Sequence, residues 1–429
     1  MTANAHKRKT QSRAQRREAL LDAASSVEVA ASYDVVVIGG GAAGLTAAIC
    51  AGEKNARTLV LESSRECGRS ILATGNGRCN FSNVGLAEKY YNDPEFVGAV
   101  FGNDPLKDVL GFFRQCDMRW CLEEERLYPL SKRATSVRNV LLHRARNAGV
   151  TLAPARSVTS VRREGDGYAV AFADGFGNGS SHEVSARSVV LAAGGTQSDG
   201  KIDVARDLGL RTVPTSGVLC PVGMEPNPML ELDGRRLTAR VQLTHTRFPI
   251  WSERGEVLVR PYGLSGIVIF NMSRHVEPGD LVELDLLPDL TASELQQMVD
   301  PFFKGTFESG CLDGVLDPDL AAILEGLARS RWSLDGNGTA DATTDSKALV
   351  ALAKSYPLRA TGTTEVAQAQ VLRGGLANDQ FSPQALECLS SPGFFVAGEA
   401  LDVDGECGGF NLSWAWKSGM VAGTSAATR

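Results

Sequence analysis

A glycine turn between two apolar runs, within residues 33–62, constrains the fold more than any other feature of the sequence. Residues 35–38 form a continuous apolar run, which is typical of a strand buried on both faces of a parallel sheet. The run leads into Gly39-x-Gly41-x-x-Gly44, after which small and apolar residues follow at helical spacing and residues 58–61 form a second apolar run. Strand, glycine turn, helix and strand in this order predict an α/β domain of the Rossmann type.

This turn has the composition that the binding of a pyrophosphate requires. Gly39 allows a tight turn, Gly41 lets a phosphate approach the backbone, and Gly44 lets the helix pack closely on the strands. The first helical turn supplies N–H donors and the positive end of the helix dipole. An acidic residue at the tip of the second strand, roughly 20 residues further on, can accept hydrogen bonds from a ribose diol. The predicted binding residues of this turn are Gly39, Gly41, Ala42, Ala43, Gly44 and Glu62.

Only one such fingerprint occurs in the chain. Residues 189–193 form another apolar run, which ends in Gly194-Gly195 without opening a second Gly-x-Gly-x-x-Gly. The chain therefore offers one complete Rossmann half for the binding of a dinucleotide, and no dedicated site of this kind for a second one. If the tightly held ligand is FAD, a nicotinamide either docks transiently or is absent. Ala193 and Gly194 are predicted to border the cofactor.

A second glycine-rich block lies shortly after the acidic residue, at residues 68–83. Glycines alternate there with arginine and asparagine, so the backbone can approach a flat ring or a phosphate while the arginines supply donors. An ordinary surface loop is the alternative, because such compositions are common in loops. The residues predicted to pass near the cofactor are Arg69, Thr74, Gly75, Asn76, Gly77, Arg78, Cys79 and Asn80.

A third block, at residues 396–419, combines a buried strand, a glycine loop and a helix of small residues. A helix that begins near Gly409 can stabilise negative charge on a reduced flavin, and Glu399 can accept from ribityl or ribose hydroxyls. Trp414 and Trp416 are expected to pack in the core, as helical aromatic residues usually do. The predicted binding residues of the block are Gly398, Glu399, Gly408, Gly409, Phe410 and Asn411.

The order of the blocks predicts a discontinuous first domain. We expect an FAD-binding domain made of residues 31–195 and 359–429, interrupted by an insert of residues 196–358. The insert has strand patterns first and helical patterns over about residues 291–355. Residues 1–30 carry clustered Lys and Arg and are expected to form a disordered basic tail. A basic arm for an anionic partner, or a transit-like segment, is the alternative for this tail.

Charge and cysteine content exclude several classes of protein. Lys plus Arg number 44 and Asp plus Glu 50, a net charge of −6, which argues against a chain whose main task is to coat nucleic acid. No uncharged apolar run reaches the roughly 18 residues of a spanning helix. Nine cysteines without Cys-x-x-Cys, and five scattered histidines, predict no metal site. Reduced thiols favour the cytoplasm, and the oligomeric state stays open.

Taken together, the three blocks resemble the BaiN-like (HI0933-type) family of FAD-dependent, often NAD(P)H-using, flavoproteins. The resemblance runs from about Tyr33 to Gly423 and is strongest at residues 75–80 and 398–405. It implies FAD in a two-lobed domain, with an insert made of a β-barrel and a small helical bundle. It also implies electron transfer, which in some members reduces carbon–carbon double bonds of steroid-like acids and in others oxidises aminoacetone.

Two positions depart from the family pattern. Ser70 stands where Lys is usual, and Cys407 stands where Thr or another small residue is common. A thiol just before a helix N-terminus has a lowered pKa if the dipole dominates, whereas a small apolar filler is the alternative for Cys407. Gly263-Leu264-Ser265-Gly266 is similar to a family block at the insert, and it lacks the spacing of a serine nucleophile elbow.

We therefore expect an FAD-dependent oxidoreductase that reduces an activated carbon–carbon double bond in a small organic, for example steroid-like, substrate. NADH or NADPH is the expected transient electron donor. A flavin-dependent oxidase of amines or other small molecules that uses molecular oxygen, and a flavin-binding electron carrier or sensor, are the alternatives. No general acid is evident, and the candidates for a catalytic role are Arg78, Tyr262 and Cys407.

Overall fold

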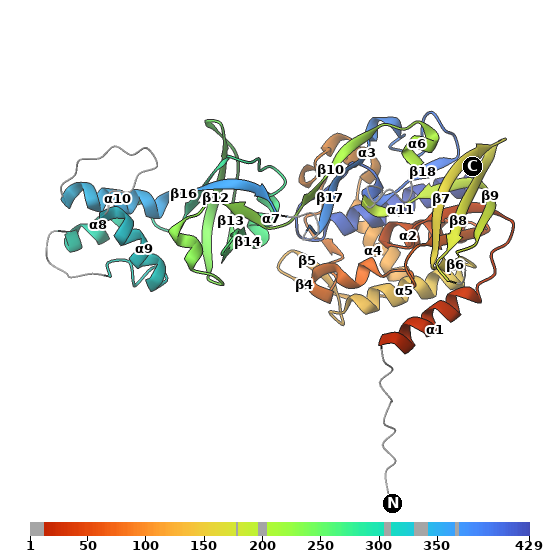
Figure 1. Ribbon diagram of the computed structural model, residues 1–429, viewed down its shortest axis with the longest axis horizontal. Helices are drawn as coiled ribbons and strands as arrows, with labels where there is room; N and C mark the ends of the chain where they lie inside the picture. Colours follow the sequence, from red (N-terminus) through yellow and green to blue (C-terminus); the bar gives the residue numbers. More distant parts are fainter. Residues whose placement is uncertain (1–12, 177–178, 196–203, 304–309, 330–341, 365–368) are drawn as a thin grey trace, which may run out of the picture. The chain divides into compact units, whose positions relative to one another are not determined.

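The computed structural model describes residues 13–176, 179–195, 204–303, 310–329, 342–364 and 369–429. The chain divides into two compact units (Figure 1). Unit 1 consists of Met1–Ser216 and Arg373–Arg429, and unit 2 consists of Gly217–Leu372. The predicted fold class, a Rossmann-type domain with an inserted β-barrel and helical bundle, is confirmed.

Unit 1 is built on a seven-stranded sheet of order β6-β2-β1-β9-β8-β7, with β18 beside β9. β1 (Ser32–Ile38) lies between β2 (Thr58–Glu62) and β9 (Ser181–Leu191), and both neighbours run parallel to it. The valines of β1 are fully buried, as expected for a central strand of such a sheet. The other strands are β6 (Thr151–Pro154), β7 (Arg156–Glu164), β8 (Gly167–Asp174) and β18 (Phe394–Val396).

Two helices that begin at glycine turns lie side by side in unit 1. α2 (Ala42–Gly52) follows β1, and α11 (Phe410–Thr428) ends the chain next to it (Figure 1). Small residues permit this approach, because a Cβ on Gly423 would lie 2.1 Å from the Ala47 carbonyl oxygen. Trp414 and Trp416 of α11 are 1% and 0% exposed, which confirms their expected place in the core.

The rest of unit 1 covers and extends this arrangement. The further helices are α3 (Pro94–Phe101), α4 (Pro105–Gln115), α5 (Ala134–Asn147) and α6 (Val204–Leu208). A small antiparallel sheet of order β3-β5-β4 consists of β3 (Ser82–Asn83), β5 (Arg126–Pro129) and β4 (Trp120–Glu123). β3 is the end of the second glycine-rich block, and its pairing with β5 fixes that end of the block.

The N-terminal segment differs from the disordered tail expected for residues 1–30. Residues 13–25 form the helix α1 (Arg13–Ser25), and the Lys and Arg residues before position 13 lie outside the described residues. Arg156, which is 6% exposed, holds the end of this helix. Its Nη1 donates to the Ala24 carbonyl oxygen at 3.0 Å, and its Nη2 donates to the Val27 carbonyl oxygen at 3.0 Å. This long-range contact is not visible in the local sequence pattern.

Unit 2 consists of a closed antiparallel barrel of order β11-β14-β13-β12-β15-β16 and of helices. The barrel strands are β11 (Val222–Met224), β12 (Arg236–His245), β13 (Phe248–Arg260), β14 (Gly263–Ser265), β15 (Leu281–Asp285) and β16 (Tyr356–Thr363). α7 (Ile267–Met272) follows β14. α8 (Ala292–Phe303), α9 (Pro318–Arg329) and α10 (Ala342–Lys354) lie where the sequence predicts a helical bundle. Within the described ranges, no helix is both long and apolar enough to cross a membrane.

The limits of the two units differ from the boundaries predicted after residues 195 and 358. The chain leaves unit 1 through β10 (Thr212–Val218) and returns through β17 (Val371–Leu376), and these strands form a two-stranded sheet. β16 extends beyond residue 358 because it closes the barrel by pairing with both β11 and β15. That pairing is non-local, so periodicity alone does not reveal it. The division into separately folding domains stays a prediction.

Candidate functional site

The turn between β1 and α2 has the shape of a phosphate cradle. Gly39 has a φ of +100°, and a Cβ there would lie 2.4 Å from the Ala192 carbonyl oxygen. A Cβ on Gly44 would lie 1.9 Å from the Gly39 carbonyl oxygen. Gly41 is more open: the nearest atom to a Cβ there would be Ser70 Oγ, at 3.2 Å. Because Gly41 is the N-cap of α2 and offers no side chain, the first N–H groups of the helix can bind an anion.

Glu62, at the end of β2, lies against the same turn. Its Oε2 accepts a hydrogen bond from the Gly40 N–H at 2.6 Å, and its Oε1 accepts one from the Ser64 N–H at 2.6 Å. Cys67 lies beside the turn, with its Sγ 3.0 Å from where a Cβ on Gly40 would be. Burial raises the pKa of the Cys67 thiol to about 12, so this residue is an uncharged filler.

The second glycine-rich block forms a sharply bent loop. η1 (Ser70–Gly77) is kinked, and both Gly75 and Asn76 have positive φ angles, of 54° and 53°. Cys79 follows with a φ of 56° and is fully buried, and burial raises the pKa of its thiol to about 11. The side-chain oxygen of Asn80 is buried and has no hydrogen-bond partner among the described residues. A buried acceptor without a donor is rare in a folded protein, and a bound ligand can supply the donor.

Arg78, a predicted cofactor or catalytic residue, has partners within the protein. Its Nη2 donates to Glu123 Oε2 at 2.5 Å, and its guanidinium lies over the Tyr128 ring, 4.4 Å from the centroid. Lys132 also pairs with Glu123. The hydrogen bond that Arg78 donates to Glu123 raises the pKa of Arg78. These contacts hold the guanidinium in place and use one of its five N–H donors, so Arg78 can still donate to a substrate oxygen from this position. Arg69 is exposed at the N-cap of η1.

The third block ends in a glycine pair at the start of α11. Gly408 and Gly409 have φ angles of +127° and +98°, and a Cβ on Gly409 would lie 2.6 Å from the Ser82 carbonyl oxygen. Gly409 is the N-cap of α11 and offers no side-chain cap. This helix therefore presents a second N-terminus whose N–H groups can stabilise negative charge.

Phe410 and Asn411 contact the loop that leads into α11. The Phe410 ring stacks on Tyr90 with centroids 4.5 Å apart. The Asn411 side chain accepts from the Gly405 N–H at 2.8 Å and donates to the Gly405 carbonyl oxygen at 2.7 Å. Both side chains thus support the position of the glycine pair.

The structure brings the three blocks together. A Cβ on Gly398 would lie 2.8 Å from the Cβ of Ala43, which connects the third block to the first turn of α2. A Cβ on Gly409 would lie 2.8 Å from the unpaired oxygen of Asn80, which connects the third block to the second. The fingerprint turn, the bent loop and the start of the last helix therefore lie close together in unit 1, as a shared cofactor site would require.

The end of β9 lies at the same site. Gly194 has a φ of +72°, and a Cβ there would lie 3.8 Å from Glu399 Oε2. Ala193 is half-buried beside it, and Cys407 is half-buried in the loop before α11. Tyr262, by contrast, belongs to unit 2, where it is 42% exposed after β13. The sequence reasoning did not count Gly40 and Cys67 among the site residues, and the run of three glycines was a signal for Gly40 alone. Ser70, which the sequence marked only as a departure from the family pattern, lies beside Gly41.

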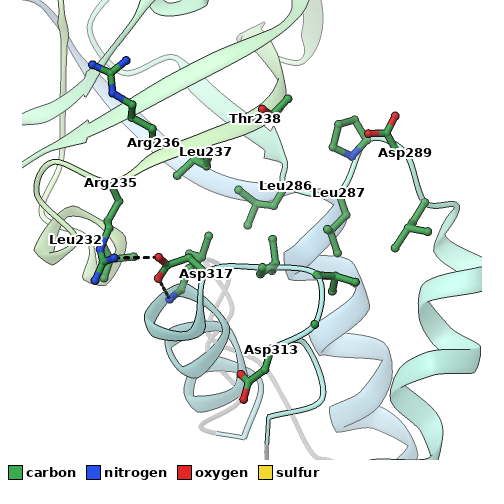
Figure 2. Close-up of a pocket in the computed structure, with 16 residues that line it drawn as sticks. Leu232, Arg235, Arg236, Leu237, Thr238, Leu286, Leu287, Asp289, Asp313 and Asp317 are labelled. Carbon is green, nitrogen blue, oxygen red and sulfur yellow. Dashed lines mark hydrogen bonds and ion pairs between the residues drawn. The ribbon is translucent and has the colours of Figure 1, made fainter.

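A cavity of about 400 Å³ lies within unit 2 and contains none of these residues (Figure 2). Seven of the sixteen residues that line it are leucines, among them Leu237 of β12 and Leu286 and Leu287 after β15. Four of its five charged lining residues are in ion pairs: Arg235 with Asp317 at 3.1 Å, Arg236 with Glu256 at 2.5 Å, and Asp289 with Arg254 at 2.6 Å. These charges are thus engaged within unit 2, and the cavity offers no evident catalytic constellation.

The sheet, the phosphate cradle and the second uncapped helix beside it define a Rossmann-type flavoprotein oxidoreductase. The residues fit FAD, because the cradle at Gly41 is open, the α2 N-terminus is uncapped and the Asn80 oxygen lacks a donor. The chain belongs to the family described as the HI0933-like protein Rossmann domain, whose family model matches residues 33–425. The predicted family resemblance is thereby confirmed.

Two characterised relatives align over nearly their whole length. The 3-dehydro-bile acid delta(4,6)-reductase of Clostridium scindens is 31% identical over 412 residues, which cover 92% of this chain and 98% of the relative. The ribosomal RNA dihydrouridine synthase of Escherichia coli is 27% identical over 402 residues, covering 90% and 96%. Among solved structures, a 3-ketosteroid-Δ4-(5α)-dehydrogenase from Rhodococcus jostii has a TM-score of 0.46 at 17% identity, with 95% and 99% coverage.

Proposed function

We propose that this protein is an FAD-dependent reductase of an activated carbon–carbon double bond in a small organic substrate, with NADH or NADPH as electron donor. The choice of reaction rests on one observation, which is what the names of the two relatives have in common. Their names denote saturation of a double bond, in a steroid acid in one case and in the uracil ring of uridine in the other. A steroid-like acid is the substrate class we favour.

The chain's own residues have separable tasks in this proposal. The uncapped N-terminus of α2 at Gly41 binds the pyrophosphate, and Glu62 accepts from the ribose. The bent loop with Asn80 and the glycine pair before α11 border the ring. FAD, when bound, supplies the hydride chemistry. The N-terminus of α11 favours the negative charge that accompanies flavin reduction.

A uridine in RNA is the second candidate substrate. It is favoured by one observation, the alignment to the ribosomal RNA dihydrouridine synthase over 96% of that protein. The net charge of −6 favours the small molecule, since an RNA-binding surface is usually basic. The predictions of a cytoplasmic location and of no nucleic-acid partner belong to this proposal and stay untested.

Product analysis separates these functions. Purified protein is incubated without oxygen with NADH or NADPH and one acceptor: a 3-oxo-4-ene steroid acid, or an RNA that contains uridines. A gain of two hydrogens by mass spectrometry in the steroid supports the favoured proposal, and the same gain in the RNA supports the second. If neither acceptor is reduced but an amine yields hydrogen peroxide in air, the protein is an oxidase. A flavin that no tested substrate reduces or oxidises would indicate a carrier or sensor.

A further inference from the structure

A buried ion pair lies at the base of the loop that leads into α11. The side chain of Asp404 is 0% exposed, and its carboxylate accepts from Arg373 Nε at 2.7 Å and from Arg373 Nη2 at 3.0 Å. Two N–H donors on two carboxylate oxygens form the fork geometry, which is specific in orientation. The Asp404 carboxylate loses its hydration entirely, whereas the Arg373 side chain stays 28% exposed. Because that desolvation offsets much of the attraction between the charges, such a pair adds little net stability compared with apolar residues of similar volume. The pair is therefore better explained by control of charge or position than by stability.

The main chain around Asp404 has a single, well-defined geometry. The Asp404 N–H donates to Asn92 Oδ1 at 2.9 Å, and the Asp404 carbonyl oxygen accepts from the Asn92 N–H at 3.0 Å. The next residue, Gly405, exchanges two hydrogen bonds with the Asn411 side chain of α11. These bonds hold the Asp404 charge at a constant position, four residues before Gly408, the first of the glycine pair that begins α11.

We propose that Arg373 is a positioning residue that cancels the charge of Asp404 and so sets the electrostatic potential at the flavin. This inference rests on the proposed function, because it requires the flavin beside Gly408 and Gly409. An isolated carboxylate there opposes the dipole of α11, which favours negative charge on a reduced flavin. An isolated guanidinium adds to the dipole and makes reduction easier. The ion pair holds the loop in place, and because its two charges cancel, it neither hinders nor favours reduction of the flavin.

The reduction potential of the bound flavin tests this inference. Asp404→Asn keeps the shape of the side chain and removes the Asp404 charge from Arg373, which does not lose its proton. The carboxylate of Asp402, which also acts on Arg373, is the same in both proteins, so the variant changes the local charge by one unit. We expect the potential of this variant to be more positive than that of the wild type. In the double variant Asp404→Asn/Arg373→Met both charges are absent, so the potential returns toward the wild-type value. As a matched control, Asp289→Asn removes the exposed partner of Arg254 in unit 2 and leaves the potential unchanged.

Other outcomes overturn the inference. If Asp404→Asn binds flavin with an unmoved potential, or if the double variant stays as shifted as the single one, Arg373 does not act through charge. A purely structural pair lowers the unfolding temperature of the flavin-free protein in both variants and leaves the potential alone. Should Asp404→Asn not fold, Arg373→Gln must have a more negative potential than Arg373→Lys. A wild-type protein that holds no flavin would refute the proposed function itself.

Discussion

Two glycines of the fingerprint, three residues apart, have different tasks. A Cβ on Gly41 meets only Ser70 Oγ, at 3.2 Å, so Gly41→Val should fold and lose FAD because the side chain fills the phosphate space. A Cβ on Gly44 would lie 1.9 Å from the Gly39 carbonyl oxygen, so Gly44→Ala should lower the free energy of unfolding by about 1–3 kcal/mol or more. The flavin content after purification tests the prediction for Gly41→Val, and urea unfolding of the flavin-free proteins tests the prediction for Gly44→Ala. Equal losses of stability in both variants would contradict it.

Glu62 is expected to bind the adenosine ribose. Glu62→Arg replaces an acceptor with a charged donor, and losing a hydrogen bond to a charged group costs about 1.5–3 kcal/mol. FAD affinity should therefore fall roughly 10- to 100-fold, and the flavin should be lost during purification. Glu183→Arg is the control, because Glu183 is an exposed partner of Arg162. This variant should keep its flavin. Full flavin occupancy in Glu62→Arg would overturn the assignment.

The two cysteines near the site are expected to behave differently. Cys79 is fully buried and its pKa is raised to about 11 by burial, so it should stay a neutral thiol at ordinary pH. Cys407 is half-buried in the loop before α11, where a thiolate could give a charge-transfer band with oxidised flavin. If it does, a pH-dependent long-wavelength band vanishes in Cys407→Ser and survives in Cys79→Ser. Unchanged spectra and turnover in Cys407→Ser would leave only the role of a small filler.

At the scale of elements, the buried Arg156 binds the C-terminal end of α1. Arg156→Met removes the donors to the Ala24 and Val27 carbonyl groups and leaves these acceptors without their partner. We expect the free energy of unfolding to fall by about 1.5–3 kcal/mol, with faster hydrogen exchange over residues 13–25 and unchanged flavin content. Arg162→Met, which removes an exposed ion pair, should change neither quantity. Slow exchange of α1 in Arg156→Met would show that other contacts hold the helix.

Elements with strong local patterns could be predicted from the sequence, and those that depend on distant partners could not. The strand, turn and helix around Gly41 follow from glycine spacing and apolar runs, as does the helical bundle of unit 2. The anchor of α1 and the closure of the barrel by β16 were missed, because both depend on residues far away in the chain. The contacts of Arg78 with Glu123 and Tyr128 were missed for the same reason.

At the scale of the whole molecule, the site is formed by blocks that lie far apart in the sequence, in the two chain segments of unit 1. Residues near Gly41 and Gly409 approach one another because α2 and α11 pack through small residues such as Gly423. The sequence predicted that these blocks share one cofactor, through their glycines and the family resemblance. It could not predict the buried Arg373–Asp404 pair, since an arginine and an aspartate in separate segments carry no mark of their pairing.

The central claim, that a flavin in this protein passes electrons to an activated double bond, is tested most directly by anaerobic stopped-flow spectroscopy. Flavin-loaded protein is mixed with NADH or NADPH, and then with a 3-oxo-4-ene steroid acid. We predict that the visible absorption band of the oxidised flavin bleaches with a nicotinamide and returns in proportion to the enone added. A flavin that neither nicotinamide bleaches, or a reduced flavin that only oxygen reoxidises, would contradict the claim.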